Sequence, residues 1–121
     1  MKIAITSTGQ DLNAQTDPRF GRCQYFIILD PETMKFTAHD NASAMQRGGA
    51  GPMAAKIISD LGAEIVITGD VGPNAFDALR AAGIKSFVGA SGTVTQAMQQ
   101  WKDGKLMEAG GASVGSHAGM R

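Results

Sequence analysis

Residues 47–52 read Arg47-Gly48-Gly49-Ala50-Gly51-Pro52, and here the chain changes from a hairpin pattern to alternating strands and helices. Glycine lets backbone N–H groups approach a ligand closely, and Pro52 stands where the first residue of a helix is expected. A helix start carries unpaired N–H donors and about half a positive charge. The stretch therefore predicts an anion-binding helix N-terminus, although glycine is also common in loops that simply enter a helix.

The composition of the 121-residue chain is that of one small globular domain. Hydrophobic residues make up 43% and charged residues 18%, and eleven basic residues balance eleven acidic ones. This balance disfavours nucleic acid as a partner. Cys23 is the only cysteine, which excludes an internal disulfide and a zinc site of several thiolates. The chain shows neither a signal peptide nor a membrane-spanning run, so we expect a cytoplasmic protein with no membrane partner.

Apolar periodicity predicts five strands and three helices. The strands are expected at residues 2–6, 25–30, 34–38, 64–68 and 84–88, and the helices at residues 53–61, 75–82 and 93–102. The second and third strands predict an antiparallel hairpin, and the later strand–helix repeats imply parallel strands with right-handed crossovers. The fold class is then α/β with a five-stranded mixed sheet. Residues 1–106 are expected to form the domain, and residues 107–121 a flexible tail rich in Gly, Ser and Ala.

Ligands of open α/β sheets bind beyond the carboxyl ends of the strands. The loops at residues 69–74 and 89–93 should therefore meet residues 47–52 at one edge of the sheet. The loop at residues 19–23 carries two arginines, an aromatic ring and a thiol, and is expected to face them. The candidate binding residues are Arg19, Phe20, Gly21, Arg22, Cys23, Gly48, Gly49, Ala50, Gly51, Gly69, Val71, Gly72, Asn74, Ser91, Gly92 and Thr93.

Several candidates have a structural alternative. The cation of Arg22 would lower the pKa of the neighbouring Cys23 thiol and favour a soft-metal thiolate, but a free cysteine is more often a small buried hydrophobe. Arg19 and Arg22 could clamp an anion, or could fix the loop by pairing with an aspartate such as Asp17. Phe20 is expected to anchor the loop in the core.

Two histidines are candidate metal ligands. His39 precedes Asp40, whose carboxylate could orient the imidazole toward a metal, although a histidine at a strand end is commonly a surface residue. His117 lies in the expected tail, from which it could reach a copper or iron ion. Methionine thioethers could bind copper(I), but Met53 and Met98 lie on the expected core faces of helices.

Two enzyme classes that use similar motifs fit the sequence poorly. Residues 49–54 match the dinucleotide fingerprint in form, but no strand leads directly into them and Pro52 removes one N–H donor. A two-metal nuclease needs clustered carboxylates, and residues 2–6 contain none. An enzyme that binds a nucleotide or phosphate ligand through the same glycine loops remains the alternative function.

The order of several motifs resembles the dinitrogenase iron-molybdenum cofactor biosynthesis family over residues 1–106. These motifs are Asp-Pro-Arg-Phe-Gly-Arg at residues 17–22, Gly-Gly-Ala-Gly at 48–51, Ile-Thr-Gly-Asp-Val-Gly-Pro-Asn-Ala at 67–75 and Gly-Ile at 83–84. The length and the lone cysteine are most similar to the orange-protein group of sulfate-reducing bacteria. The resemblance implies a ribonuclease H-like three-layer fold and non-catalytic binding, storage or carriage of a metal-sulfur cluster.

The same resemblance implies the cargo and the partners. A molybdenum-copper sulfide is the favoured cluster, and an iron-molybdenum precursor is the alternative. Such an anion with a soft surface could be held without covalent ligands, by N–H donors, by Arg19 and Arg22, and by apolar contact with Phe20, Met45 or Met53. A cluster donor or acceptor protein is the expected partner, and the chain is expected to be a monomer or a weak dimer.

Overall fold

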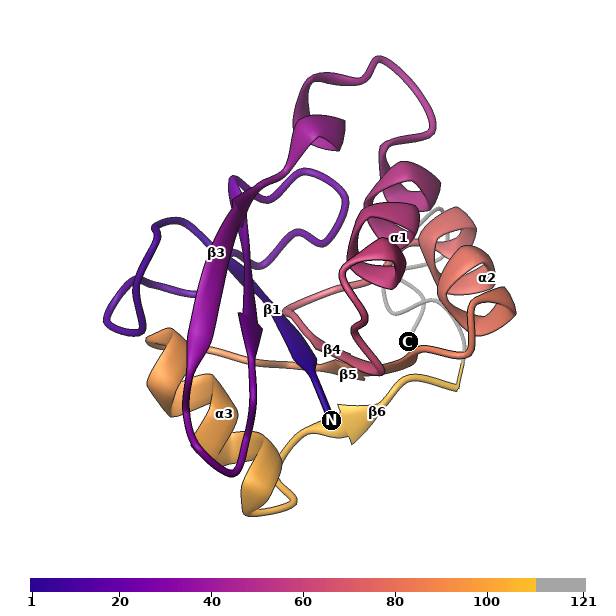
Figure 1. Cartoon of the computed structure of the whole chain (residues 1–121). Helices are drawn as coiled ribbons and strands as arrows, with labels where there is room; N and C mark the ends of the chain where they lie inside the picture. Colours follow the sequence, from indigo (N-terminus) through magenta and orange to yellow (C-terminus); the bar gives the residue numbers. More distant parts are fainter. Residues whose placement is uncertain (111–121) are drawn as a thin grey trace.

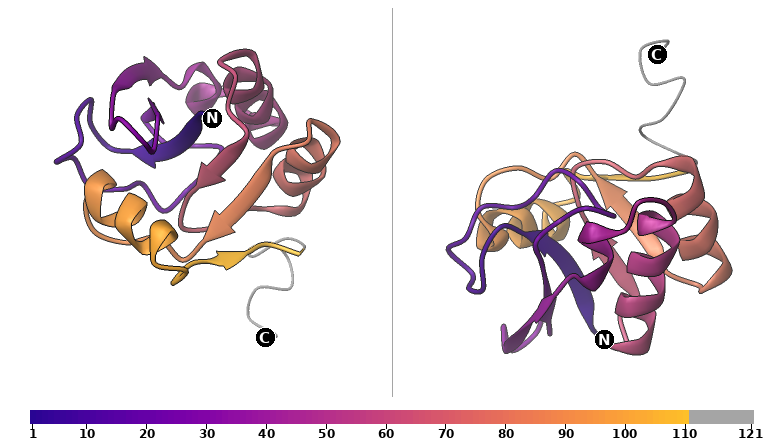
Figure 2. Two further views of the ribbon diagram at one scale, coloured as in Figure 1. Left: turned by 60° about the horizontal axis from the view of Figure 1, so that its bottom comes forward. Right: turned by 90° about the horizontal axis from the view of Figure 1, so that it is seen from above.

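One mixed β-sheet runs through the molecule and has helices on both faces (Figures 1 and 2). The computed structural model describes residues 1–110. The elements are β1 (Ile3–Ser7), β2 (Tyr25–Leu29), β3 (Phe36–Asp40), the 3-10 helix η1 (Ala42–Met45), α1 (Ala50–Asp60), β4 (Ile65–Ile67), α2 (Pro73–Ala81), β5 (Lys85–Val88), α3 (Val94–Lys102) and β6 (Met107–Glu108). The strand order is β3-β2-β1-β4-β5-β6, with parallel pairing among β1, β4 and β5 and antiparallel pairing elsewhere.

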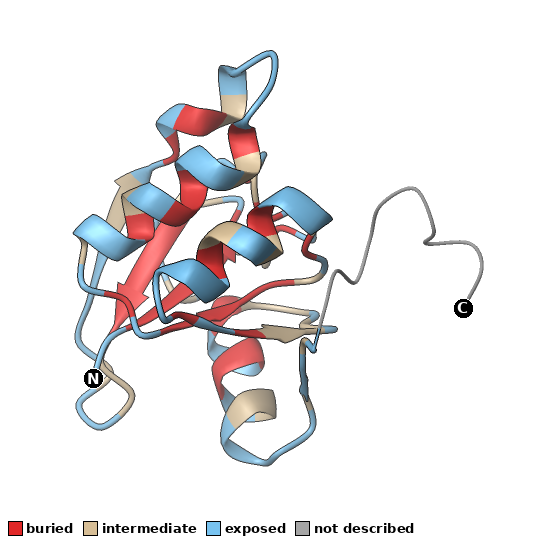
Figure 3. Ribbon diagram, turned by 90° about the vertical axis from the view of Figure 1, so that its right-hand side faces the viewer, coloured by how far each residue is buried: buried red, intermediate tan, exposed pale blue. Residues whose placement is uncertain are grey.

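Alternate residues of the central strands build two separate cores, because successive side chains of a strand point to opposite faces. In β1, Ala4 faces the core beneath α1 and α2, whereas Ile3 and Ile5 face the core beneath α3. Figure 3 shows the buried strands between helices whose outer surfaces are exposed. The mixed α/β class is confirmed, and its ribonuclease H-like designation stays a prediction. No helix within residues 1–110 is long and apolar enough to cross a membrane.

The sheet has six strands rather than the five expected. The additional strand is β6, which lies in the segment expected to be tail. Met107 and Glu108 pair with Val88 and Phe87, and the Ala109 N–H donates to the Ser86 carbonyl at 2.8 Å. Both residues of β6 are exposed, so the strand rests on backbone pairing and leaves no apolar pattern in the sequence. Residues 111–121, which include His117, lie outside the described residues.

The hairpin turn places β3 two residues later than residues 34–38. The Asp30 carboxylate accepts hydrogen bonds from the N–H groups of Glu32 (2.8 Å) and Thr33 (3.4 Å), and these bonds lower the pKa of Asp30. Met34 has a φ of 62°, which is uncommon for a residue other than glycine. The turn therefore includes Met34, although its apolar side chain suggests that it belongs to the strand.

The three α-helices begin in different ways. Gly49, with a φ of 73°, is the N-cap of α1, so this helix starts at Ala50 and Pro52 is its third residue rather than its first. Proline is still tolerated there, because N–H groups in the first turn have no intrahelical partner. Pro73 is the first residue of α2. Thr93 caps α3 in a reciprocal box with Gln96.

Candidate functional site

The loop between β1 and β2 is fixed along the edge of the sheet where β1, β4 and β5 have their carboxyl ends. The Thr6 hydroxyl donates to the Asp17 carbonyl at 2.6 Å and lies 2.9 Å from the Thr68 hydroxyl. The Asp17 N–H donates back to the Thr6 carbonyl at 3.0 Å. These buried bonds join the ends of β1 and β4 and hold the start of the arginine-containing loop across them.

Three close backbone approaches bring that loop to the glycine-rich helix starts. The Asp70 N–H donates to the Pro18 carbonyl at 2.8 Å, and a Cβ on Gly69 would lie 2.7 Å from Pro18 backbone atoms. A Cβ on Gly21 would lie 2.9 Å from the Gly51 nitrogen, and one on Gly51 would lie 2.7 Å from the Cβ of Ala75. Glycine at these positions therefore lets the loop, the start of α1 and the start of α2 pack against one another.

The starts of α1 and α2 carry N–H groups that donate no hydrogen bond within residues 1–110. These groups belong to Ala50 and Gly51 in α1 and to Asn74 and Ala75 in α2, and neither helix has a side-chain cap. The contact between Gly51 and Ala75 places the two helix starts next to each other. Their partial positive charges therefore add at one place on the surface.

The start of α3 is different, because the chain itself occupies its donors. The N–H groups of Val94 and Thr95 donate to the carbonyls of Ala14 (2.9 Å) and Leu12 (3.1 Å), and that of Gln96 donates to the Thr93 hydroxyl (3.1 Å). The helix also lies on the opposite face of the sheet. Within residues 1–110, only two of the three expected helix starts therefore have unoccupied donors, and the binding role expected of Ser91, Gly92 and Thr93 stays a prediction.

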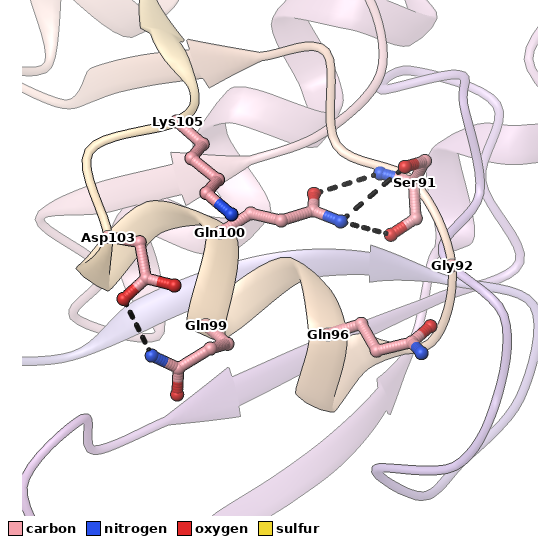
Figure 4. A pocket seen from close by; sticks show the side chains of 7 residues that line it. All are labelled: Ser91, Gly92, Gln96, Gln99, Gln100, Asp103 and Lys105. Carbon is pink, nitrogen blue, oxygen red and sulfur yellow. Dashed lines mark hydrogen bonds between the residues drawn. The ribbon is translucent and has the colours of Figure 1, made fainter.

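Ser91 and Gly92 line a shallow hollow of about 310 Å³ beside α3 (Figure 4). The Gln100 amide closes over Ser91, accepting from its N–H at 3.3 Å and donating to its carbonyl at 3.1 Å. The remaining lining residues are Gln96, Gln99, Asp103 and Lys105. The amides of Gln96 and Gln100 bond the backbone, the Gln99 amide bonds the Asp103 carboxylate, and one acidic and one basic side chain line the hollow.

Both arginines of the loop fix its conformation. Arg19 Nε and a second guanidinium nitrogen contact the carboxylate of buried Asp17 at 3.2 and 3.3 Å, and this hydrogen bonding raises the pKa of Arg19. Arg22 donates to the carbonyls of Ala44 (2.9 Å) and Gln46 (2.5 Å) at the end of η1. Arg19 thus pairs with Asp17 as the loop-fixing alternative expected, whereas Arg22 bonds backbone carbonyls rather than an aspartate.

Two exposed residues lie beside the α1 start. Arg47, which belongs to the glycine-rich stretch expected to bind an anion, makes no ion pair or side-chain hydrogen bond within residues 1–110. Met45, at the end of η1, is 91% exposed. Met45 was expected as an apolar contact for the cluster, but its exposure depends on the tertiary structure and has no signal in the sequence.

Cys23 is fully buried in the core beneath α1 and α2. Burial raises the pKa of its thiol to about 12, and the negative charge of Asp17 acts in the same direction. The Asn41 amide nitrogen lies 3.5 Å from the sulfur and donates to the carbonyls of Cys23 (2.9 Å) and Gly21 (3.1 Å). The thiol is therefore protonated and enclosed at neutral pH, which fits the buried-hydrophobe alternative and not a metal thiolate.

Phe20 and His39 each contact a neighbouring side chain. Phe20 is buried against Phe26, with ring centroids 5.8 Å apart, and anchors the loop. His39 lies in β3, where its Nε2 is 2.8 Å from the Thr37 hydroxyl. It lines a hollow of about 520 Å³ with Asp60 and Leu61, among others. Residues 1–110 contain no group of three or more His, Cys, Asp or Glu side chains placed to hold a metal ion.

Comparisons with known proteins find one matching family and solved structures with a similar fold. A family profile described as dinitrogenase iron-molybdenum cofactor matches residues 1–104. The apo form of the orange protein from Desulfovibrio gigas has a TM-score of 0.89 and 43% identity, covering 92% of this chain and 94% of that one. The NMR structure of a Thermotoga protein of the DUF35 family has a TM-score of 0.77 and 37% identity, covering 88% and 91%. An uncharacterized protein from Methanocaldococcus jannaschii is 26% identical over 109 residues, covering 88% of this chain and 89% of its own.

Proposed function

The chain belongs to the dinitrogenase iron-molybdenum cofactor family, and on this basis we propose that it binds and carries a metal-sulfur cluster without catalysing a reaction. The cluster is its cargo, received from a donor protein or delivered to an acceptor protein in the cytoplasm. A molybdenum-copper sulfide, which the motif resemblance to the orange-protein group implies, is the first candidate cargo, and an iron-molybdenum precursor is the second.

The adjacent starts of α1 and α2 are the observation that carries this proposal. Their free N–H groups converge on one place, and two helix starts with uncapped donors suit an anion too large for one helix to surround. A Cβ on Gly48 or Gly49 would meet nothing within 4 Å, so there is open space around the two glycines that lead into α1. The binding wall is therefore formed by residues 47–51 and residues 72–75.

The side chains around this wall suit a sulfido anion better than a phosphate. Arg47 supplies an exposed guanidinium with no competing carboxylate, and Met45 and Met53 expose thioether groups on either side of the glycine stretch. Thioethers are polarizable and soft, so they contact metal-bound sulfide favourably. No covalent ligand is required, which agrees with the enclosed thiol of Cys23.

Titration of the apo protein with tetrathiomolybdate and copper(I) tests this function. We expect a protein-bound species with visible charge-transfer absorption and a fixed molybdenum-to-protein ratio after gel filtration. Arg47→Ala should weaken its retention, whereas Arg80→Ala should not, because Arg80 is equally exposed but lies at the far end of α2. Parallel calorimetry with inorganic phosphate and ATP addresses the alternative function. Micromolar binding of either one, without retention of the thiomolybdate species, would falsify the cluster proposal.

A further inference from the structure

The outer edge of β3 is an unpaired strand edge. Within residues 1–110, this strand ends the sheet and pairs only with β2. Figure 1 shows it as the outer strand of the hairpin. At the other end of the sheet, β6 is only two residues long, so β3 with five residues is the longer of the two edges within residues 1–110.

The register identifies the backbone groups that face outward. Lys35 pairs with Asp30, and Asn41 with Gln24, through backbone bonds of 2.9 and 3.0 Å. Antiparallel strands alternate bonded and non-bonded pairs, so Thr37 and His39 also bond β2. The N–H and C=O groups of Phe36, Ala38 and Asp40 therefore point away from the sheet.

These outward groups are complementary to a second copy of themselves. If two β3 strands run antiparallel about a twofold axis at Ala38, Ala38 faces Ala38 and Phe36 faces Asp40 of the second copy. Three N–H and three C=O groups on each strand then form six hydrogen bonds and leave none of these groups unused. We propose that the chain forms a symmetric dimer in which the two β3 strands pair in this register, joining the two sheets into one.

The side chains fit this arrangement. Asp40 would face Phe36 of the second copy, and Lys35 would face Asn41, so no like charges stand opposite each other. On the face of the strand that carries Lys35 and Asn41, Thr37 would face His39 of the second copy. These two side chains already interact within one strand, at 2.8 Å. The chain has a formal net charge of zero, so long-range repulsion between copies is small.

The strand has few of the features that normally prevent edge pairing. Soluble proteins protect a strand edge with charged residues, lysine above all, with proline, a bulge or a covering element. The five residues of β3 contain no lysine or proline, and their pairing with β2 is continuous over all five positions, without a bulge. Its acidic residue is Asp40, and Lys35 stands just before the strand, but neither meets a like charge in the proposed register. Because this register uses every outward backbone group of both strands, we take a second copy as the occupant.

Sedimentation velocity of the full chain, from micromolar to near-millimolar concentration, tests the dimer. The mass should rise with concentration from 12.6 kDa toward twice that value. Ala38→Pro removes an outward N–H and fixes φ, a change that edge strands tolerate, and it should raise the dimer dissociation constant at least about tenfold. Ala38→Ser retains the N–H and should dimerise like the wild type. Urea unfolding of each variant verifies that the fold persists.

A charge test examines the register itself. Ala38→Lys and Ala38→Asp each place like charges on the twofold axis, so each variant alone should be monomeric. An equimolar mixture should form a heterodimer, because the opposite charges then face each other. A wild-type chain that remains at 12.6 kDa at the highest concentration overturns the proposal. So does a dimer that persists unchanged in Ala38→Pro and in both charged variants, because its interface would then lie elsewhere.

Discussion

Cys23 shows how burial decides the chemistry of a single residue. Its sequence neighbour Arg22 suggests a lowered thiol pKa, but the Arg22 guanidinium reaches away to the carbonyls at the end of η1. The thiol instead lies in the core, where the loss of solvation, and after it the negative charge of Asp17, raises its pKa. A chain neighbour contributes to a pKa only where its side chain is folded toward the group.

The first prediction concerns the pH dependence of stability that this burial produces. The pKa of Cys23 rises from an ordinary 9.0 to about 12 in the folded chain, so above pH 9 the unfolded state loses the proton first. Stability from this thiol is complete below pH 9 and is lost progressively as the pH rises from 9 toward 12, by about 1.4 kcal/mol per pH unit. Urea unfolding at pH 8 and pH 10 should therefore show a drop about 1.4 kcal/mol larger in the wild type than in Cys23→Ala. Equal drops would mean that the native thiol ionises normally.

The second prediction concerns the glycines that allow close backbone contact. A Cβ on Gly69 would lie 2.7 Å from backbone atoms of Pro18, which cannot rotate away. Gly69→Ala should therefore lower the free energy of unfolding by about 1–3 kcal/mol. Gly48→Ala is the matched control, since its Cβ would meet nothing within 4 Å, and it should change stability by less than about 0.5 kcal/mol. If urea unfolding shows equal losses in the two variants, the close packing of Gly69 against Pro18 does not require a glycine at this position.

At the scale of the elements, the three α-helices differ in which groups accept hydrogen bonds from their first N–H groups. The α3 donors bond carbonyls of the loop after β1 and the Thr93 hydroxyl, whereas α1 and α2 have glycine caps that contribute no side chain. A helix start whose N–H groups bond within the chain stabilises the fold. A helix start capped by glycine leaves its N–H donors available to a ligand.

The third prediction separates these two kinds of helix start. Thr93→Ala removes the hydroxyl that accepts from Gln96, and should lower the free energy of unfolding by about 1 kcal/mol. It should leave the affinity for thiomolybdate with copper(I) unchanged, because α3 is not part of the proposed wall. Measuring both properties in the same variant is decisive. If the variant is fully folded but retains the cluster more weakly, α3 is part of the binding site.

At the scale of the whole molecule, local patterns determined most of the fold. The helix stops at Gly62 and Gly83 and the apolar strand at residues 64–68 are strong local signals, and α1, α2 and β4 lie where these signals indicate, within a few residues. The strand β6 was not predictable, because exposed residues that pair only through their backbone carry no hydrophobic period. The later start of β3 follows from the turn at Asp30, whose side-chain bonds compete with strand pairing.

The candidate site was predictable only in part, because it depends on long-range contacts. The position of glycine-rich loops after parallel strands follows from topology alone. The pairing of Arg19 with Asp17 is local and was anticipated as an alternative. The occupation of the α3 donors by Leu12 and Ala14 could not be foreseen, because the path of an irregular loop across a helix more than 80 residues away leaves no sequence pattern.

The fourth prediction tests where the folded unit ends. A chain that stops after Leu106 loses β6, including its pairing with β5 and the bond from Ala109 to Ser86. It also exposes the edge of β5, whose residues Val88 and Phe87 pack against the two cores. We expect a loss of about 1–3 kcal/mol in the free energy of unfolding, from a few backbone hydrogen bonds at about 1 kcal/mol each. A chain that stops after Gly110 keeps β6 and is the control. If urea unfolds both truncated chains at the same midpoint, β6 contributes nothing to stability and the folded unit ends at residue 106.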